Sequence, residues 1–232
     1  MSLKFNRICL YCSLFSAFLL FFQFSYAQTD FSNVDALLKQ NQKLLGNGVV
    51  AMIYKDGKVI YQKELGEDFK AKTQAPIASC SKWLTAALVM IFVDEGKIKL
   101  DDPVSKYIPL FDKYMKSYVT IRQCLSHTTG IENEKGGLMK ILQRKKYASL
   151  EEEVNAYAAK EISNNAGTEF HYGTIGINVA GRVLEVVSKK SFDRLIQDKL
   201  LRPLKMRATS FVDEGGNAPN PSGGARCSAP PV

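Results

Sequence analysis

The feature that most constrains this chain is the stretch APIASCSKWLTAALVMIFVDEGK at residues 75–97. Ser79 precedes Lys82 by three positions, just before a run in which almost every residue is apolar. Residues three apart lie on one face of a helix, and a helix that is apolar all round is buried on all sides. The stretch predicts such a helix from about Ser79 to Glu95, with Gly96 ending it.

The neighbouring serine and lysine indicate a particular chemistry. A lysine beside an apolar core loses hydration of its ammonium group, so it releases its proton more readily. It can then accept the proton of a serine hydroxyl, while N–H groups at a helix N-terminus stabilise a developing negative charge. Ser79 and Lys82 therefore suit an acyl-transfer centre. The alternative is structural, with Ser79 capping the helix and Lys82 extending to solvent from the first turn.

The first 27 residues have the pattern of an export signal. Two basic residues precede a mostly apolar stretch from residue 10 to 22, and Ser25-Tyr26-Ala27 offers the small residues that signal peptidases recognise. We predict that residues 1–27 are a cleaved signal peptide of a bacterial protein in the periplasm or outside the cell. A retained anchor is the alternative, but polar residues interrupt the stretch, and a spanning helix needs roughly 20 apolar residues. Residues 28–232 are long enough for one domain.

Charge and cysteine content exclude several classes of protein. The formal net charge is +8, but basic and acidic residues are interspersed and no nucleic-acid-binding motif occurs, so no nucleic-acid partner is expected. Outside the signal segment the chain has three cysteines, Cys80, Cys124 and Cys227, at spacings that fit no zinc motif. Since the only histidines are His127 and His171, we predict no metal site and no cofactor.

The rest of the chain predicts one β-hairpin among short helices. Asp56-Gly57 is a strong turn signal between two β-rich runs. A two-stranded ribbon is not stable alone, so either helices cover it or further strands belong beside it. Helices are expected at about 34–45, 120–130, 149–162, 179–188 and 192–201, and the Gly/Pro-rich end is expected to be loop.

Four segments carry a resemblance to a known family. They are IASCSKWLTAALVMIFVDEGKIKLDDPVSKYIP, TIRQCLSHTTGI, GTEFHYGTIGINVAGRVLEVVSKKSFDRLIQDKLLRPLKM and NPSGGARCSA, in that order. Together they resemble the serine β-lactamase and penicillin-binding protein superfamily, in its class C-like branch, which also holds esterases and D-amino-acid peptidases. The resemblance covers nearly all of residues 34–229. It implies an α/β fold of the α+β type, with an antiparallel sheet covered by helices beside a helical region.

The resemblance also implies roles for single residues. Ser79 resembles the nucleophile that becomes acylated, and Lys82 resembles its proton partner. Tyr172 resembles the tyrosine that shares proton transfer with the lysine and protonates the leaving group; a phenol near an ammonium is held closer to its anion. Without the family context, Tyr172 reads as a half-buried aromatic in a loop.

The tyrosine motif departs from the family pattern, which is Tyr-x-Asn. Here it is Tyr172-Gly173-Thr174. Thr174 at this substrate-binding position cannot present an amide to a substrate carbonyl. The departure counts against β-lactam hydrolysis more than against hydrolysis of esters or amides.

Three other residues near these motifs are interpreted as non-catalytic. His127 is expected to satisfy backbone groups in the turn at Gly130. His171 is expected to be peripheral because neighbours in an extended loop point opposite ways. Cys80 is expected to lie in the core rather than to act as a nucleophile.

The family has a third motif, Lys-Thr-Gly or His-x-Gly, on a later strand, but neither follows the tyrosine segment in this sequence. We therefore expect residues 28–232 to be the N-terminal part of such a domain, with its C-terminal strands missing, and weakly active or inactive. In the family, the strand that carries this motif supplies one of the two backbone N–H groups that stabilise the oxyanion. The loss of one such donor typically costs about 100- to 1,000-fold in turnover.

The expected function is that of an exported serine hydrolase acting through an acyl-enzyme. Its substrate would be small or peptidoglycan-like, with an ester, D-amino-acid amide or β-lactam bond. The alternative is a catalytically inactive fragment that binds peptidoglycan or a protein partner.

Overall fold

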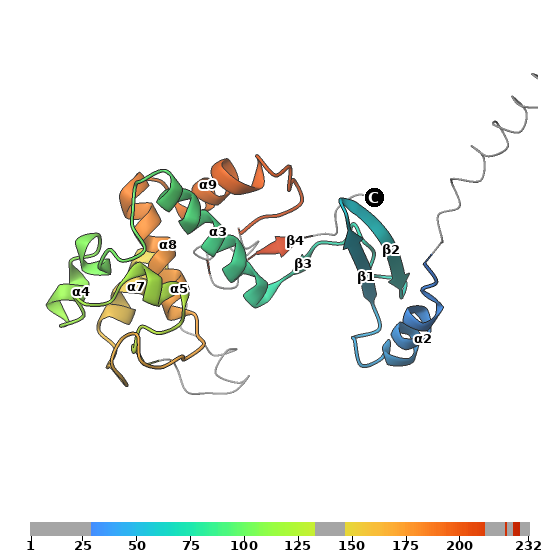
Figure 1. Ribbon diagram of the computed structural model, residues 1–232, viewed down its shortest axis with the longest axis horizontal. Helices are drawn as coiled ribbons and strands as arrows, with labels where there is room; N and C mark the ends of the chain where they lie inside the picture. Colours follow the sequence, from blue (N-terminus) through green and yellow to red (C-terminus); the bar gives the residue numbers. More distant parts are fainter. Residues whose placement is uncertain (1–28, 133–146, 212–220, 222–224, 228–232) are drawn as a thin grey trace, which may run out of the picture. The chain divides into compact units, whose positions relative to one another are not determined.

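The computed structural model describes residues 29–132, 147–211, 221 and 225–227. The predicted signal segment lies outside them. The chain divides into two compact units, the first ending at Lys70 and the second beginning at Ala71 (Figure 1). The elements are α2 (Ser32–Asn41), β1 (Val49–Lys55), β2 (Lys58–Leu65), β3 (Ala75–Pro76), α3 (Ser81–Asp94), α4 (Leu110–Lys113), α5 (Ile121–Leu125), α7 (Leu150–Ala158), α8 (Ile175–Ser188), α9 (Phe192–Ile196) and β4 (Arg226–Cys227).

The first unit is a hairpin with one helix. Strands β1 and β2 pair antiparallel, and the turn between them has positive φ at Asp56 and Gly57, as a two-residue hairpin turn requires. The predicted hairpin is therefore confirmed. The Asp35 carboxylate on α2 accepts hydrogen bonds from the Tyr61 hydroxyl at 2.7 Å and from the Lys63 ammonium at 3.0 Å. These bonds join helix α2 to the ribbon, which agrees with the first of the two alternatives given for the hairpin; the helix is shorter than predicted.

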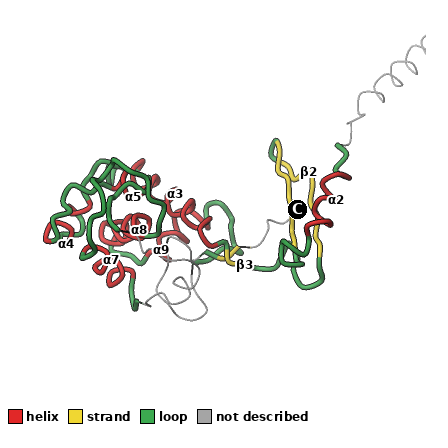
Figure 2. Tube along the Cα trace, turned by 90° about the horizontal axis from the view of Figure 1, so that it is seen from below, coloured by secondary structure: helices red, strands yellow, loops and turns green. Residues whose placement is uncertain are grey.

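The second unit is built around α8. This helix contacts α3, α5, α7 and α9, which are labelled among the red segments of Figure 2. Leu88 and Phe92 of α3 and Val179 and Val183 of α8 are completely buried in the shared core. Helices α5 and α8 meet backbone to backbone at Gly176, where an added Cβ would lie 2.3 Å from the carbonyl oxygen of Cys124. The core therefore lies between helices.

The predicted helix from about Ser79 to Glu95 is confirmed within two residues at its ends, but the prediction that it is buried on all sides is wrong. The α-helix begins at Ser81, because residues Ala78–Cys80 form a 3-10 turn instead. The helix is not buried all round, since Trp83 is 79% exposed and Met90 is 39% exposed. An all-apolar pattern predicts burial on every face, but only the face that meets α8 and α9 finds partners among the described residues.

The other helix predictions hold in kind and differ at their ends. Helix α7 ends four residues early, α8 begins four residues early at Ile175, and α9 changes to a π turn at residues 197–201. The short helix α4 lies inside an expected loop. Both predicted N-terminal caps are present, because Thr120 and Ser149 accept hydrogen bonds from the backbone N–H three residues later.

A second, very short sheet was not predicted. Strand β3 pairs antiparallel with β4, so that Ala75 lies opposite Cys227 and Pro76 lies opposite Arg226. The end of the chain was expected to be loop throughout, and residues 226–227 correct this expectation. Glycine and proline content indicates turns but carries no information about a partner strand far away in the sequence. Within the described ranges, no helix has the length and apolar character needed to cross a membrane.

Candidate active site

The candidate nucleophile lies in a tightly held turn. Ser79 is exposed in the 3-10 turn before α3, and the residue before it, Ala78, has a φ of +45°. This left-handed conformation is uncommon for a residue with a side chain. The Ser81 hydroxyl is completely buried and donates a hydrogen bond to the Ala78 carbonyl at 2.6 Å. The same hydroxyl accepts one from the Ala225 N–H at 2.9 Å, which ties the turn to a distant segment.

Two further hydrogen bonds strengthen this tie. The Ile77 N–H donates to the Ala225 carbonyl at 3.0 Å, and the buried Thr85 hydroxyl donates to the Pro221 carbonyl at 2.6 Å. Residues on both sides of Ser79 are thus anchored to the segment around residue 225. Sequence reasoning missed this support, although the second serine of Ser79-Cys80-Ser81-Lys82 was the available signal.

The structure brings the three predicted catalytic side chains together. The Lys82 ammonium donates a hydrogen bond to the Ser79 hydroxyl at 3.1 Å, and it lies 5.0 Å from the centre of the Tyr172 ring. The hydrogen bond with Ser79 lowers the pKa of Tyr172; burial acts in the opposite direction, and Lys82 lowers it further. The group therefore places a serine oxygen, an amine and an acidified phenol within reach of one another.

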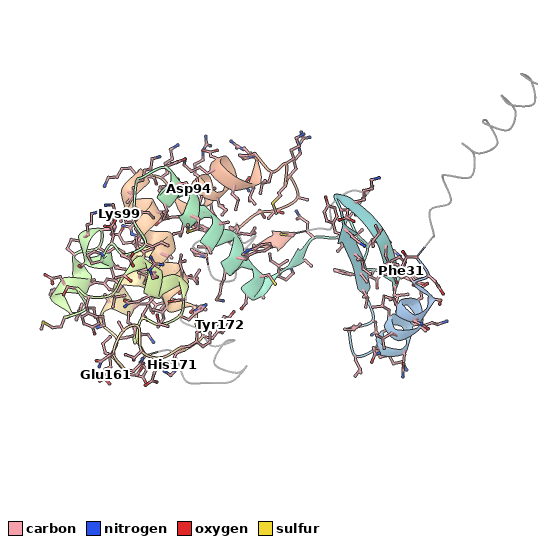
Figure 3. The ribbon with its side chains drawn as sticks, in the orientation of Figure 1. Phe31, Asp94, Lys99, Glu161, His171 and Tyr172 are labelled. Atoms are coloured by element: carbon pink, nitrogen blue, oxygen red, sulfur yellow. The ribbon has the colours of Figure 1, made fainter. Side chains whose placement is uncertain are left out.

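The structural alternatives for Ser79 and Lys82 do not hold. The N-cap position of α3 is Cys80, and its side chain makes no capping hydrogen bond. Lys82 is only 8% exposed, so its ammonium is not extended into solvent. Figure 3 shows Tyr172 near the end of α3 opposite to Asp94, on the loop that leads into α8. Its ring is 56% exposed and accessible from solvent.

His127 adjoins the tyrosine rather than the turn at Gly130. Its Nδ1 accepts a hydrogen bond from the Gly173 N–H at 3.4 Å, and its ring lies 4.7 Å from the Tyr172 ring, centre to centre. Burial lowers the pKa of His127, and the charge of Lys82 lowers it further. The expectation that His127 satisfies backbone groups is right in kind, but its partner is in the tyrosine loop. His171 is exposed and bonds Glu169 at 3.0 Å, which confirms its peripheral place.

The remaining predicted residues are placed as follows. Cys80 is exposed, so the prediction that it lies in the core is wrong: it precedes the first turn of α3 and faces away from the core. Cys124 is buried, and burial raises the pKa of its thiol to about 12.

Thr174, the predicted substrate-binding residue, lies at the start of α8, where its side chain makes no capping hydrogen bond. No cluster of three metal-binding side chains occurs among the described residues.

Comparisons with known proteins agree on one family. The family model described as Beta-lactamase matches residues 34–232. A teichoic acid D-alanine hydrolase from Staphylococcus aureus is 32% identical over 183 residues, which cover 76% of this chain and 44% of that protein. Protein flp of Staphylococcus aureus strain MW2 is 29% identical over 174 residues, covering 71% of this chain and 34% of that protein.

A solved structure shows the same relation in three dimensions. A candidate beta-lactamase from Bacteroides dorei matches with a TM-score of 0.75 at 30% identity, over 86% of this chain and 60% of that chain. The likeness confirms the expected β-lactamase/transpeptidase-like α/β fold. The chain spans about a third to under a half of the length of the two curated relatives.

Proposed function

The chain belongs to the beta-lactamase family, and on that premise we propose that it is an exported serine hydrolase that works through an acyl-enzyme on Ser79. The observation that carries the proposal is the 3.1 Å hydrogen bond from the Lys82 ammonium to the Ser79 hydroxyl, beside a tyrosine of lowered pKa. Export rests on the signal pattern of residues 1–27.

In the first step, the Ser79 oxygen attacks the acyl carbonyl of the substrate. The serine proton passes to Tyr172 in its phenolate form, whose negative charge the adjacent Lys82 ammonium stabilises. The lowered pKa of Tyr172 supports this role, because it increases the fraction of phenolate near neutral pH. Tyr172 then returns the proton to the leaving oxygen or nitrogen, which departs and leaves the acyl group on Ser79.

In the second step, water hydrolyses the acyl-enzyme. Tyr172 accepts a proton from the attacking water, and the serine oxygen regains a proton as the ester bond breaks. Lys82 donates a hydrogen bond to the Ser79 oxygen at 3.1 Å, which places this proton partner beside the atom that gives up and regains the proton. No cofactor enters either step.

The bond we favour is an ester or a D-amino-acid amide of a small or cell-wall substrate. Similarity to a teichoic acid D-alanine hydrolase supports this class. Thr174 supports it too, because its hydroxyl cannot take the place of a side-chain amide toward a substrate carbonyl. We therefore expect faster turnover of a p-nitrophenyl ester or a D-alanyl amide than of a chromogenic cephalosporin.

A fluorophosphonate probe tests the nucleophile directly. The full chain should form a covalent adduct, and mass spectrometry should locate it on the peptide containing Ser79. Ser79→Ala should abolish the adduct, whereas Ser105→Ala, at a half-buried serine outside the site, should leave it unchanged. A folded wild-type protein that takes up no probe would overturn the proposal. Retention of that protein on peptidoglycan would then favour a non-catalytic binding role.

A further inference from the structure

We propose that neutral His127 is a positioning residue for Tyr172, holding the tyrosine loop by two hydrogen bonds that flank it, of which the side-chain bond to Gly173 is lost when the ring is protonated. This role deepens the proposed function and rests on it, because Tyr172 is the proton-transfer group of that reaction. No step of the proposed chemistry passes through the His127 ring itself.

The contacts on the two sides of the tyrosine come from one residue. The His171 N–H donates to the His127 carbonyl at 2.9 Å, and the Gly173 N–H donates to His127 Nδ1 at 3.4 Å. The backbone of His127 thus holds the residue before Tyr172, and its side chain holds the residue after it. The two rings also lie 4.7 Å apart at an angle of 51°. This geometry limits where the Tyr172 hydroxyl can lie relative to Ser79.

The hydrogen bond to Gly173 requires one protonation state. A backbone N–H can only donate, so Nδ1 must be the acceptor, and a neutral ring then carries its proton on Nε2. Protonation of the ring places a proton on Nδ1, so that the Nδ1–H and the Gly173 N–H, both donors, would then face each other. It would also add a positive charge near Lys82, whose charge already disfavours protonation of His127. Protonation and the observed loop position therefore exclude each other.

Among the described residues, helix α3 contributes Lys82 to the surroundings of the ring, and the loop before α8 contributes Tyr172 and the pair His171–Glu169. Burial and Lys82 place the pKa of His127 below its ordinary value of 6.5. The hydrogen bond from Gly173 is therefore present at neutral pH and is lost as the pH falls through the lowered pKa of His127.

The backbone at His127 suggests a sharp substitution. Its φ is +59°, and asparagine is among the few residues that adopt this left-handed conformation readily. The side-chain oxygen of asparagine can also accept a hydrogen bond at the place of Nδ1, but it does not titrate. His127→Asn should therefore keep the hold and lose its pH dependence.

Nuclear magnetic resonance tests the hold without relying on enzymatic activity. The chain has two histidines, so exposed His171 serves as an internal reference. At about pH 7.5, His127 should show an unprotonated Nδ1 and a protonated Nε2. The amide signal of Gly173 should shift with the titration of His127 and not with that of His171. A proton on Nδ1 of the neutral ring, or a Gly173 amide signal that does not shift with the titration of His127, would overturn the inference.

Labelling of Ser79 by the fluorophosphonate tests the consequence. At about pH 7.5, His127→Ala should lower the labelling rate by about tenfold, as expected for loss of a hydrogen bond that positions a reacting group. His127→Asn should stay close to wild type at that pH and lose the acidic decline. His171→Asn, the matched control, should keep the wild-type profile.

The outcomes separate the two proposals. Circular dichroism establishes that each variant is folded. Wild-type labelling by His127→Ala, or an unchanged acidic decline in His127→Asn, would contradict the positioning role. Absence of labelling in the wild type would overturn the proposed function, while the resonance experiment would still decide whether His127 holds the loop.

Discussion

The two units differ in the contacts that stabilise each of them internally. In residues 29–70, all of which are described, no side chain is buried, and the helix is joined to the hairpin by polar contacts such as Asp35 with Tyr61. The second unit has a core of completely buried residues contributed by α3, α5, α7, α8 and α9. The candidate site belongs to this second unit. A core supplies the fixed backbone positions that a catalytic group needs.

This comparison indicates that a hydrogen bond contributes less to stability in the first unit than in the second. In the first, the bonds at Asp35 are near solvent, where water competes for each partner. In the second, the Ser81 hydroxyl and its donor residue Ala225 are both completely buried, so that no water can replace the bond between them. Substitutions of similar chemistry should therefore have larger effects after residue 71 than before it.

The largest contrast should come from aromatic side chains. Phe92→Ala removes a completely buried ring from α3 and should destabilise the second unit by about 3–5 kcal/mol. Tyr54→Ala, at an exposed position of the hairpin, should change stability by less than about 0.5 kcal/mol. Hydrogen exchange followed by mass spectrometry reports on each unit separately. Equal effects would refute the view that only the second unit has a core.

Glycine substitutions should sharpen the contrast. Gly176→Ala places a Cβ 2.3 Å from the Cys124 carbonyl oxygen, so α5 and α8 must separate, at a cost of about 3 kcal/mol. At Gly57 an added Cβ meets nothing within 4 Å, and only the left-handed φ of +78° opposes it, at about 1 kcal/mol. Thermal unfolding of the two variants checks the order. A smaller loss of stability in Gly176→Ala than in Gly57→Ala would mean that α5 and α8 can move apart at little energetic cost.

Loss of the Ser81 hydroxyl should affect both stability and the site. Ser81→Ala leaves the Ala78 carbonyl and the Ala225 N–H without this partner and should cost about 1–3 kcal/mol. It should also slow labelling of Ser79, because the strained turn loses its support. Ser105→Ala, at a half-buried serine whose hydroxyl makes one long hydrogen bond of 3.4 Å, is the control and should be near neutral. Unchanged labelling of Ser79 in a stable Ser81→Ala variant would show that the turn at Ser79 keeps its conformation without the Ser81 hydrogen bonds.

The smallest effect should appear in the first unit on acidification. The hydrogen bond from Tyr61 and then that from Lys63 lower the pKa of Asp35 below 3.8. This carboxylate therefore supports the unit above pH 3.8 and loses its effect as the pH falls below that value. Tyr61→Phe should raise the pKa of Asp35 toward 3.8, as followed by resonance titration of the carboxyl carbon. A pKa of Asp35 that does not move in Tyr61→Phe would assign the shift to Lys63 alone.

Local features were predictable from the sequence because short-range geometry determines them. Asp56-Gly57 predicts the hairpin turn, and the spacing of Ser79 and Lys82 predicts their contact. Burial of α3 was predicted wrongly because Trp83 is as apolar as its neighbours and yet faces solvent. Apolar character shows that a residue can be buried, but only the arrangement of the other helices determines which face is covered.

The sequence by itself determined the chemistry that this chain can offer: a serine and a lysine one turn apart, a tyrosine before a helix, and a family pattern that orders them. Only the tertiary structure decided how these groups are held, through Ala225 behind the Ser79 turn and His127 beside Tyr172. The reason is physical. Spacing along a helix follows from backbone geometry within a few residues, whereas contacts across about 46 or 144 positions depend on how the whole core packs.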